Sequence, residues 1–256
     1  MRTCPKCAYR HPPDAGPDPA ICAGCGLVFA KWVSHTLGTA RLPRAEQAHD
    51  DAEPGWLALQ AGRLFYVEPR TDPVHYWSRV AAYALFFVWG WYFIVLDFQT
   101  GEIGHSFMHR INLVFHEAGH VLFMPFGSFM MTLGGTLGQL LMPIVVGGVL
   151  LVKNHDPFGA SLALWWLGQS VMDCAPYIAD ARALQLTLVG GGTGQDRPGA
   201  HDWENILLDL GLIEHDIRVA AAADTAGALL MLVAFAWGGY ILFQQHRNLD
   251  DHTPAG

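Results

Sequence analysis

The segment INLVFHEAGHVLF, residues 111–123, places two histidines and a glutamate inside an apolar run. Between Arg110 and Lys153 the chain has no Lys or Arg, and Glu117 is its only acidic residue. Burying an ionisable group in so apolar a segment is energetically expensive, so such a group indicates a functional site. The sequence therefore predicts a membrane helix that contains a functional site.

His116 and His120 are four residues apart, a spacing that brings both imidazoles to one face of a helix and within reach of one cation. Glu117 lies between them, where a carboxylate can act as general base on a metal-bound water. The pattern predicts a catalytic zinc site with His116 and His120 as ligands and Glu117 as the catalytic residue.

The composition also indicates an integral membrane protein. Of the 256 residues, 52% are hydrophobic and 15% are charged, whereas soluble domains carry about 25% charged residues. The net charge of −8 argues against nucleic acid as the main partner, because phosphate binding needs a basic surface.

Five apolar stretches are candidate membrane spans: residues 80–96, 111–131, 133–152, 158–184 and 226–243. Lys and Arg gather ahead of the first, which predicts a cytoplasmic N-terminus by the positive-inside rule. We expect an all-α polytopic membrane protein with about five transmembrane helices over residues 77–246, followed by a polar tail at 247–256. The plasma membrane of a prokaryotic cell is the expected location.

Four of the five cysteines form two CxxC pairs near the N-terminus: Cys4, Cys7, Cys22 and Cys25. This spacing is typical of a zinc ribbon, in which four thiolates surround one structural Zn²⁺; disulfides or redox pairs are the alternatives. We expect the ribbon over residues 1–33, and a linker with a possible interfacial element over 34–76. The fifth cysteine, Cys174, is expected to be a packing residue.

A catalytic zinc usually takes a third protein ligand. Asp173 and Asp180 in the fourth span are seven residues apart and hence on one helical face. Pro176 between them removes a backbone donor and should open the helix toward a cavity. We predict Asp180 as the ligand, with Asp173 as second choice; the alternative is a helix-end aspartate paired with Arg182.

Two further histidines offer other arrangements. His109 precedes His116 by seven residues, so an all-histidine site is geometrically conceivable. His201 could approach the site from the loop after the fourth span. We favour a solvated surface residue for His109, and for His201 an ordinary residue beside a helix whose N-cap is Asp202.

Glycines concentrate in the third span, where Gly134 and Gly138 form a small-xxx-small pair that permits close helix packing. The same glycines could instead leave backbone groups free to bind an extended peptide. The glycine-rich loop at residues 190–194 is not expected to bind phosphate, because no strand precedes it and no Lys follows at the required position.

Together these residues resemble the site-2 protease family of intramembrane zinc metalloproteases. Residues 116–120 match the family's HExxH, residues 134–138 match its GxxxG-type stretch in form, and Asp173, Pro176 and Asp180 approximate its NxxP…DG motif. The resemblance covers residues of about 111–184. Asp173 replaces the family's Asn, Ala181 replaces its Gly, and a zinc ribbon is the soluble module in place of a peptide-binding domain.

The resemblance implies that His116, His120 and Asp180 bind zinc and that Glu117 deprotonates its water. The expected function is a zinc-dependent intramembrane endopeptidase, with one catalytic and one structural zinc, acting on a membrane-embedded or membrane-proximal segment of a protein or peptide. One alternative is a non-proteolytic zinc-binding sensor or assembly factor whose ribbon binds a cytoplasmic partner. Another is a structural or transport protein in which the pentapeptide is coincidental.

Overall fold

The computed structural model describes residues 62–249 without a gap and, nearer the N-terminus, residues 2–4, 6, 7, 9–11, 21, 22, 25, 27 and 28. The chain divides into two compact units, Met1–Glu53 and Pro54–Gly256. The predicted linker up to residue 61 and the tail beyond residue 249 lie outside the described residues.

In the first unit, short backbone turns carry the cysteines. Strands β1 (Arg2–Thr3) and β2 (Arg10–His11) pair antiparallel, with Arg2 opposite His11. The Cys4 N–H donates to the Tyr9 carbonyl at 2.8 Å, and the Cys22 N–H donates to the Leu27 carbonyl at the same distance. The two CxxC pairs therefore lie in similar turns.

The second unit is helical, and three of its helices are long and apolar enough to cross a membrane. They are α2 (Pro73–Val95), α4 (Ser128–Val152) and α7 (Asp216–Arg247) with the preceding turn η6 (Ile213–His215). Large apolar side chains such as Val95, Val145 and Val233 are exposed on them. Such surfaces are expected where lipid rather than water covers a helix.

The other two predicted spans also form helices, α3 (Phe107–Phe123) and α5 (Pro157–Ala179), but neither is among the three. The 17 residues of α3 include His109, Arg110 and the HExxH residues. Most of α5 is buried, including the polar residues Gln169 and Asp173. Both helices thus carry polar groups into the interior, and the expectation of five spans is supported for three.

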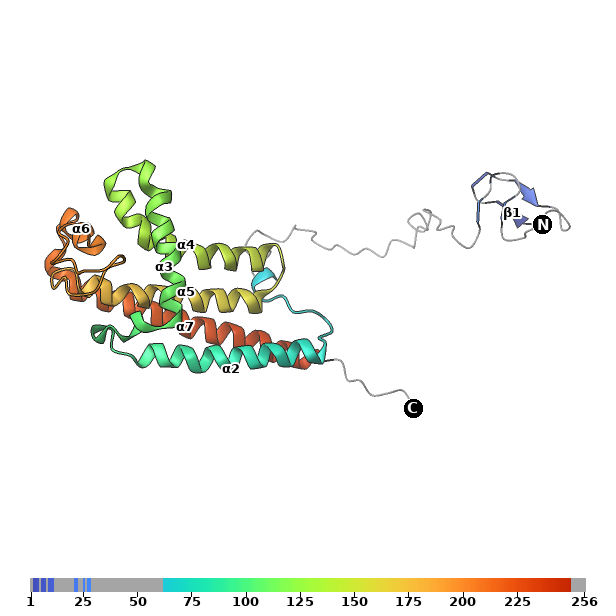
Figure 1. The fold of residues 1–256 in the computed structure, drawn as a ribbon. Coiled ribbons are helices and arrows are strands. Elements are labelled where there is room, and N and C mark those ends of the chain that lie inside the picture. Colours follow the sequence, from blue (N-terminus) through green and yellow to red (C-terminus); the bar gives the residue numbers. More distant parts are fainter. Residues whose placement is uncertain are drawn as a thin grey trace, which may run out of the picture. The chain divides into compact units, whose positions relative to one another are not determined.

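The helices pack around α5, which contacts α7 along one side and α4 along another, while α2 packs on α7 (Figure 1). The apolar core holds Phe93, Trp165 and Met231, one from each of α2, α5 and α7. Asp156 caps the start of α5, accepting from the Gly159 N–H, and pairs with Arg79 of α2 at 2.8 Å. This ion pair ties α2 to α5.

Helix α3 packs against α4 through backbone contact. A Cβ atom added to Gly134 would lie 2.7 Å from the Gly119 carbonyl oxygen, and one added to Gly138 would lie 2.8 Å from the Gly119 Cα. Only glycine allows so close an approach. The predicted close packing at Gly134 and Gly138 is confirmed, and its partner is the glycine of the HExxH segment.

Short elements complete the unit. Turns η3 (Phe98–Thr100) and η4 (Glu102–His105) connect α2 to α3, and η5 (Met124–Phe126) connects α3 to α4. After α5, an irregular loop of residues 180–201 leads to α6 (Asp202–Asp209). Because α6 packs against α4, the loop returns the chain to the side of the bundle where α3 lies.

Candidate metal centre

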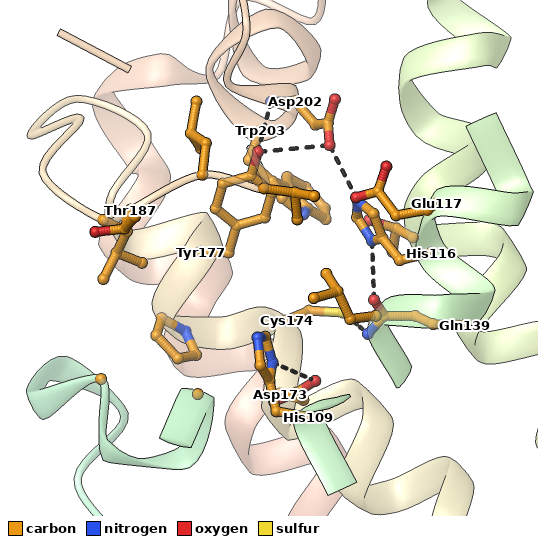
Figure 2. Close-up of a pocket in the computed structure, with 18 of the residues that line it drawn as sticks. His109, His116, Glu117, Gln139, Asp173, Cys174, Tyr177, Thr187, Asp202 and Trp203 are labelled. Atoms are coloured by element: carbon orange, nitrogen blue, oxygen red, sulfur yellow. Dashed lines mark hydrogen bonds and ion pairs between the residues drawn. The ribbon is translucent and has the colours of Figure 1, made fainter. Parts of the chain in front are cut away.

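Two helices and the return loop bring three possible metal ligands together. Nε2 of His116 lies 3.0 Å, and Nε2 of His120 3.3 Å, from the same carboxylate oxygen of Asp202, Oδ2. One donor atom from each of these residues lies within 4.8 Å of the others. Figure 2 shows the contact between the Asp202 carboxylate and His116 of the HExxH helix.

The second nitrogen of each imidazole is held by an oxygen atom. Nδ1 of His116 lies 2.9 Å from the side-chain oxygen of Gln139, and Nδ1 of His120 lies 2.8 Å from the Met131 carbonyl. Because both oxygens accept, Nδ1 must be the protonated donor in each ring. The Nε2 atoms of both rings therefore face Asp202: when protonated they donate to its carboxylate, and in the neutral rings they offer lone pairs to a cation.

Gln139 is itself fixed from the other side. Its side-chain nitrogen donates to the Ser170 carbonyl at 3.1 Å and contacts Sγ of Cys174 at 3.0 Å. Gln139 is buried, as is Cys174. A fully bonded amide of this kind orients a metal-binding histidine.

Asp202 is held by residues around the start of α6. Its N–H donates to the Tyr177 hydroxyl at 3.0 Å. His201, with no solvent exposure, caps the helix: its Nδ1 accepts from the Glu204 N–H at 3.1 Å. Burial raises the pKa of Asp202, but the hydrogen bonds from His116 and His120 outweigh it and lower that pKa to about 2. The carboxylate is therefore ionised at neutral pH.

Space for the two imidazoles comes from Gly135 on α4. A Cβ atom there would lie 2.5 Å from Nε2 of His116 and 2.6 Å from Nε2 of His120. A side chain at residue 135 would thus occupy the position where the donor atoms converge.

The cluster opens into a cavity of about 690 Å³. Glu117, whose side chain is exposed, lines this cavity beside His116 (Figure 2). Thr136, Tyr177 and Trp203 also line it. The predicted catalytic carboxylate is therefore next to the candidate ligands and open to solvent, an arrangement suited to proton exchange with water.

Neither aspartate predicted as the third ligand joins the histidine pair. Asp180 is the C-cap of α5, and its carboxylate turns to the following loop, accepting from the N–H groups of Gln185 and Leu186 at 2.9 Å each. Its Oδ2 also lies 3.4 Å from Nε2 of His201. Asp180 thus satisfies backbone donors at a helix end, and Asp202 takes the place predicted for it.

Asp173, the second choice, is engaged by His109, whose Nδ1 lies 3.0 Å from Oδ1 of the carboxylate. As expected, His109 does not join an all-histidine cluster; its side chain is 34% exposed, but one ring nitrogen contacts a buried carboxylate rather than solvent. Arg182, considered as a partner for either aspartate, instead pairs with Asp216 at 2.7 Å. Helix α5 continues through Pro176, so the predicted opening of the helix at this proline does not occur.

The N-cap of α6 is His201 rather than the predicted Asp202. Asp202 was missed as a candidate ligand because helix capping already explained an aspartate at the start of a helix. The available signal was the sequence His201-Asp202, two metal-ligating residue types in the segment between α5 and α7.

A second cluster lies in the first unit. The sulfur atoms of Cys4 and Cys25 are 3.8 Å apart, those of Cys7 and Cys22 are 3.7 Å apart, and all four cysteines are free. Burial raises the pKa of Cys4, but backbone hydrogen bonds from Cys7 and Lys6 outweigh it and lower that pKa to about 6. Four free thiols whose sulfur atoms lie this close together fit the tetrahedral sulfur site of a structural zinc.

Comparisons of the chain with models of known protein families, with curated proteins and with solved structures found no match.

Proposed function

We propose that the protein is a zinc-dependent intramembrane endopeptidase. The observation that carries the proposal is the convergence of both Nε2 atoms on the Asp202 carboxylate, with Nδ1 of each ring bound to an oxygen acceptor. Two imidazoles and one carboxylate form a ligand set that catalytic zinc uses with a fourth position open to water. The donor chemistry of the cluster therefore fits the ion.

His116, His120 and Asp202 would hold the zinc. When bound, zinc supplies a Lewis acid that polarises a carbonyl and lowers the pKa of its water to near 7. Glu117 would take the proton of the attacking water and pass it to the leaving amine, as the residue between the two histidines does in HExxH sites. Its exposure to the cavity allows it to exchange protons between cycles.

The surroundings support a substrate that lies in or near the bilayer. Three helices have the length and composition of membrane spans, and large apolar side chains are exposed on them. Hydrolysis at bilayer depth requires a water-accessible cavity bounded by protein, and the cavity beside Glu117 provides such a space.

A second candidate is a non-proteolytic sensor or assembly factor, which the separate cysteine cluster favours because small zinc modules commonly serve as docking units. It predicts zinc in both clusters without peptide hydrolysis.

The test is Glu117→Gln in purified protein. Cleavage of apolar membrane peptides should fall by about 10²- to 10⁴-fold, the usual contribution of a general base, while zinc content measured by mass spectrometry stays the same because Glu117 is not among the ligands. Glu102→Gln, at an exposed acidic residue that does not line the cavity, is the matched control. Equal cleavage by the wild type and Glu117→Gln would contradict the proposal.

A further inference from the structure

A second charged pair lines the cavity farther along α3. His109 precedes His116 by seven residues, so the two share a face of the helix and are about 10 Å apart along its axis. Both line the cavity, as does Leu113 between them. The cavity therefore follows one face of α3 for about two turns.

The carboxylate of this pair is buried. The Asp173 side chain is 3% exposed, and its oxygens lie 3.0 and 3.1 Å from Nδ1 of His109. Asn112 donates to the same carboxylate at 3.0 Å and is fixed in turn by Trp166, whose indole N–H donates to it at 2.8 Å. Within residues 62–249, no Lys or Arg forms an ion pair with Asp173.

A buried carboxylate needs a compensating positive charge, and His109 is placed to supply it. The hydrogen bond to Asp173 raises the pKa of His109, against the opposing effect of burial. The contact with Asp173 therefore commits Nδ1 and favours the protonated form of the imidazole.

The other nitrogen of His109 is available to a ligand. The side chain is 34% exposed, and within residues 62–249 no hydrogen-bond partner of Nε2 is found. Figure 2 shows His109 and Asp173 across the cavity from Asp202. A protonated ring N–H directed at the cavity binds an anionic acceptor more strongly than a neutral one.

We propose that His109 forms a subsite for a carboxylate of the substrate, about three residues from the bond that is cleaved. The spacing follows from the helix rise of about 10 Å between His109 and His116 and the roughly 3.3 Å rise per residue of an extended peptide. The carboxylate is supplied by an acidic side chain or by the C-terminus of the peptide. Asp173 and Asn112 act as positioning residues, and the inference rests on the proposed function.

The experiment uses apolar, internally quenched peptides whose cleavage site is first located by mass spectrometry. Matched peptides then carry Glu or Gln at the third residue on either side of that bond, and a further pair ends there with a free or an amidated C-terminus. The wild type should prefer one carboxylate peptide over its neutral match by about tenfold or more in kcat/KM, as a hydrogen bond between charged groups allows. The peptide pair that shows the preference identifies the source of the carboxylate.

In His109→Gln the ratio should fall to about one. Glutamine can still donate to Asp173, so the helix contact is retained, and thermal unfolding checks the fold. His215→Gln, at an exposed histidine that does not line the cavity, should keep the ratio. Equal kcat/KM ratios in the wild type and His109→Gln would overturn the subsite. A wild type that does not prefer any carboxylate peptide would overturn it without any variant.

A binding arm separates this inference from the endopeptidase itself. In the Glu117→Gln background, fluorescence anisotropy should show the same preference for the carboxylate peptide, which is lost on adding His109→Gln. If the wild type cleaves no peptide and this preference in binding remains, the endopeptidase function fails and the subsite stands. If cleavage occurs but neither assay shows a preference, the subsite fails and the endopeptidase stands.

Discussion

The side chains of Asp202 and Asp180 are 17% and 8% exposed, and the two aspartates have different partners. The carboxylate of Asp202 faces two ring nitrogens, whereas that of Asp180 accepts from two backbone N–H groups of the loop that leads to Asp202. The first is placed to bind a cation and the second to fix the path of the chain.

Replacing each by asparagine should therefore have different effects. Asp202→Asn should release the zinc of the second unit, because an amide is a far poorer ligand than a carboxylate, leaving one zinc per chain. Asp180→Asn should retain two zinc ions but bind one of them about 10- to 100-fold more weakly, the usual effect of altering a residue behind the ligands. Metal analysis with a competing chelator measures both. If Asp202→Asn kept the full zinc affinity of the wild type, Asp202 would not be the third ligand and Asp180 would again be the candidate.

The sequence could predict the histidine pair because the spacing of four residues determines their proximity on any helix. It could not predict Asp202, whose contact with His116 spans 86 positions and depends on how the loop of residues 180–201 folds. Local pattern favoured Asp180 and Asp173, but N–H groups of the loop after α5 and the His109 side chain satisfy those carboxylates instead.

At the scale of elements, the crossing of α3 and α4 determines the geometry of the site. Glycines bring the two backbones together, and Gly135 leaves room for both imidazoles. The packing of these helices is therefore part of the site rather than only its support.

Gly135→Ala tests this role. The added methyl group would displace both Nε2 atoms, so we expect at least a tenfold loss of zinc affinity and a parallel loss of cleavage, in the range seen for altered metal-site geometry. Gly148→Ala on the same helix is the control, because a Cβ there has no atom within 4 Å; it should retain zinc and gain about 0.5–1 kcal/mol of stability. Unchanged zinc affinity in Gly135→Ala would show that the helices can separate without affecting the site.

Helix positions were largely predictable, but helix ends were not. The apolar run beginning at Val80 belongs to a helix that begins at Pro73, because Asp72 caps it by accepting from the His75 N–H. The run 226–243 belongs to a helix of 32 residues, Asp216–Arg247. Hydropathy reports only the apolar part of a helix, whereas caps and polar turns set its bounds.

At the scale of the whole molecule, the two candidate metal clusters draw their ligands from separate units of the chain. The cysteines belong to residues 1–53, and the histidines and Asp202 belong to residues 54–256. No residue is shared, so the two sites should lose metal independently.

Cys4→Ser should lower the zinc content from two ions per chain to one. The thermal unfolding temperature of the second unit should stay the same. Small zinc modules unfold without their metal, so limited proteolysis should cut the first 53 residues more readily in this variant. Loss of both ions from Cys4→Ser would contradict the independence of the sites.

Gln139 joins three helices through one amide: its oxygen holds His116 of α3, its own backbone belongs to α4, and its nitrogen contacts α5. A displacement of α4 along α5 by even half a turn would break one of these bonds and free the imidazole to rotate. Bilayer thickness and lateral pressure act on the relative placement of membrane helices. The lipid composition around the protein would thereby affect how firmly the His116 imidazole is oriented, and the proposed hydrolysis would respond to the mechanical state of the membrane.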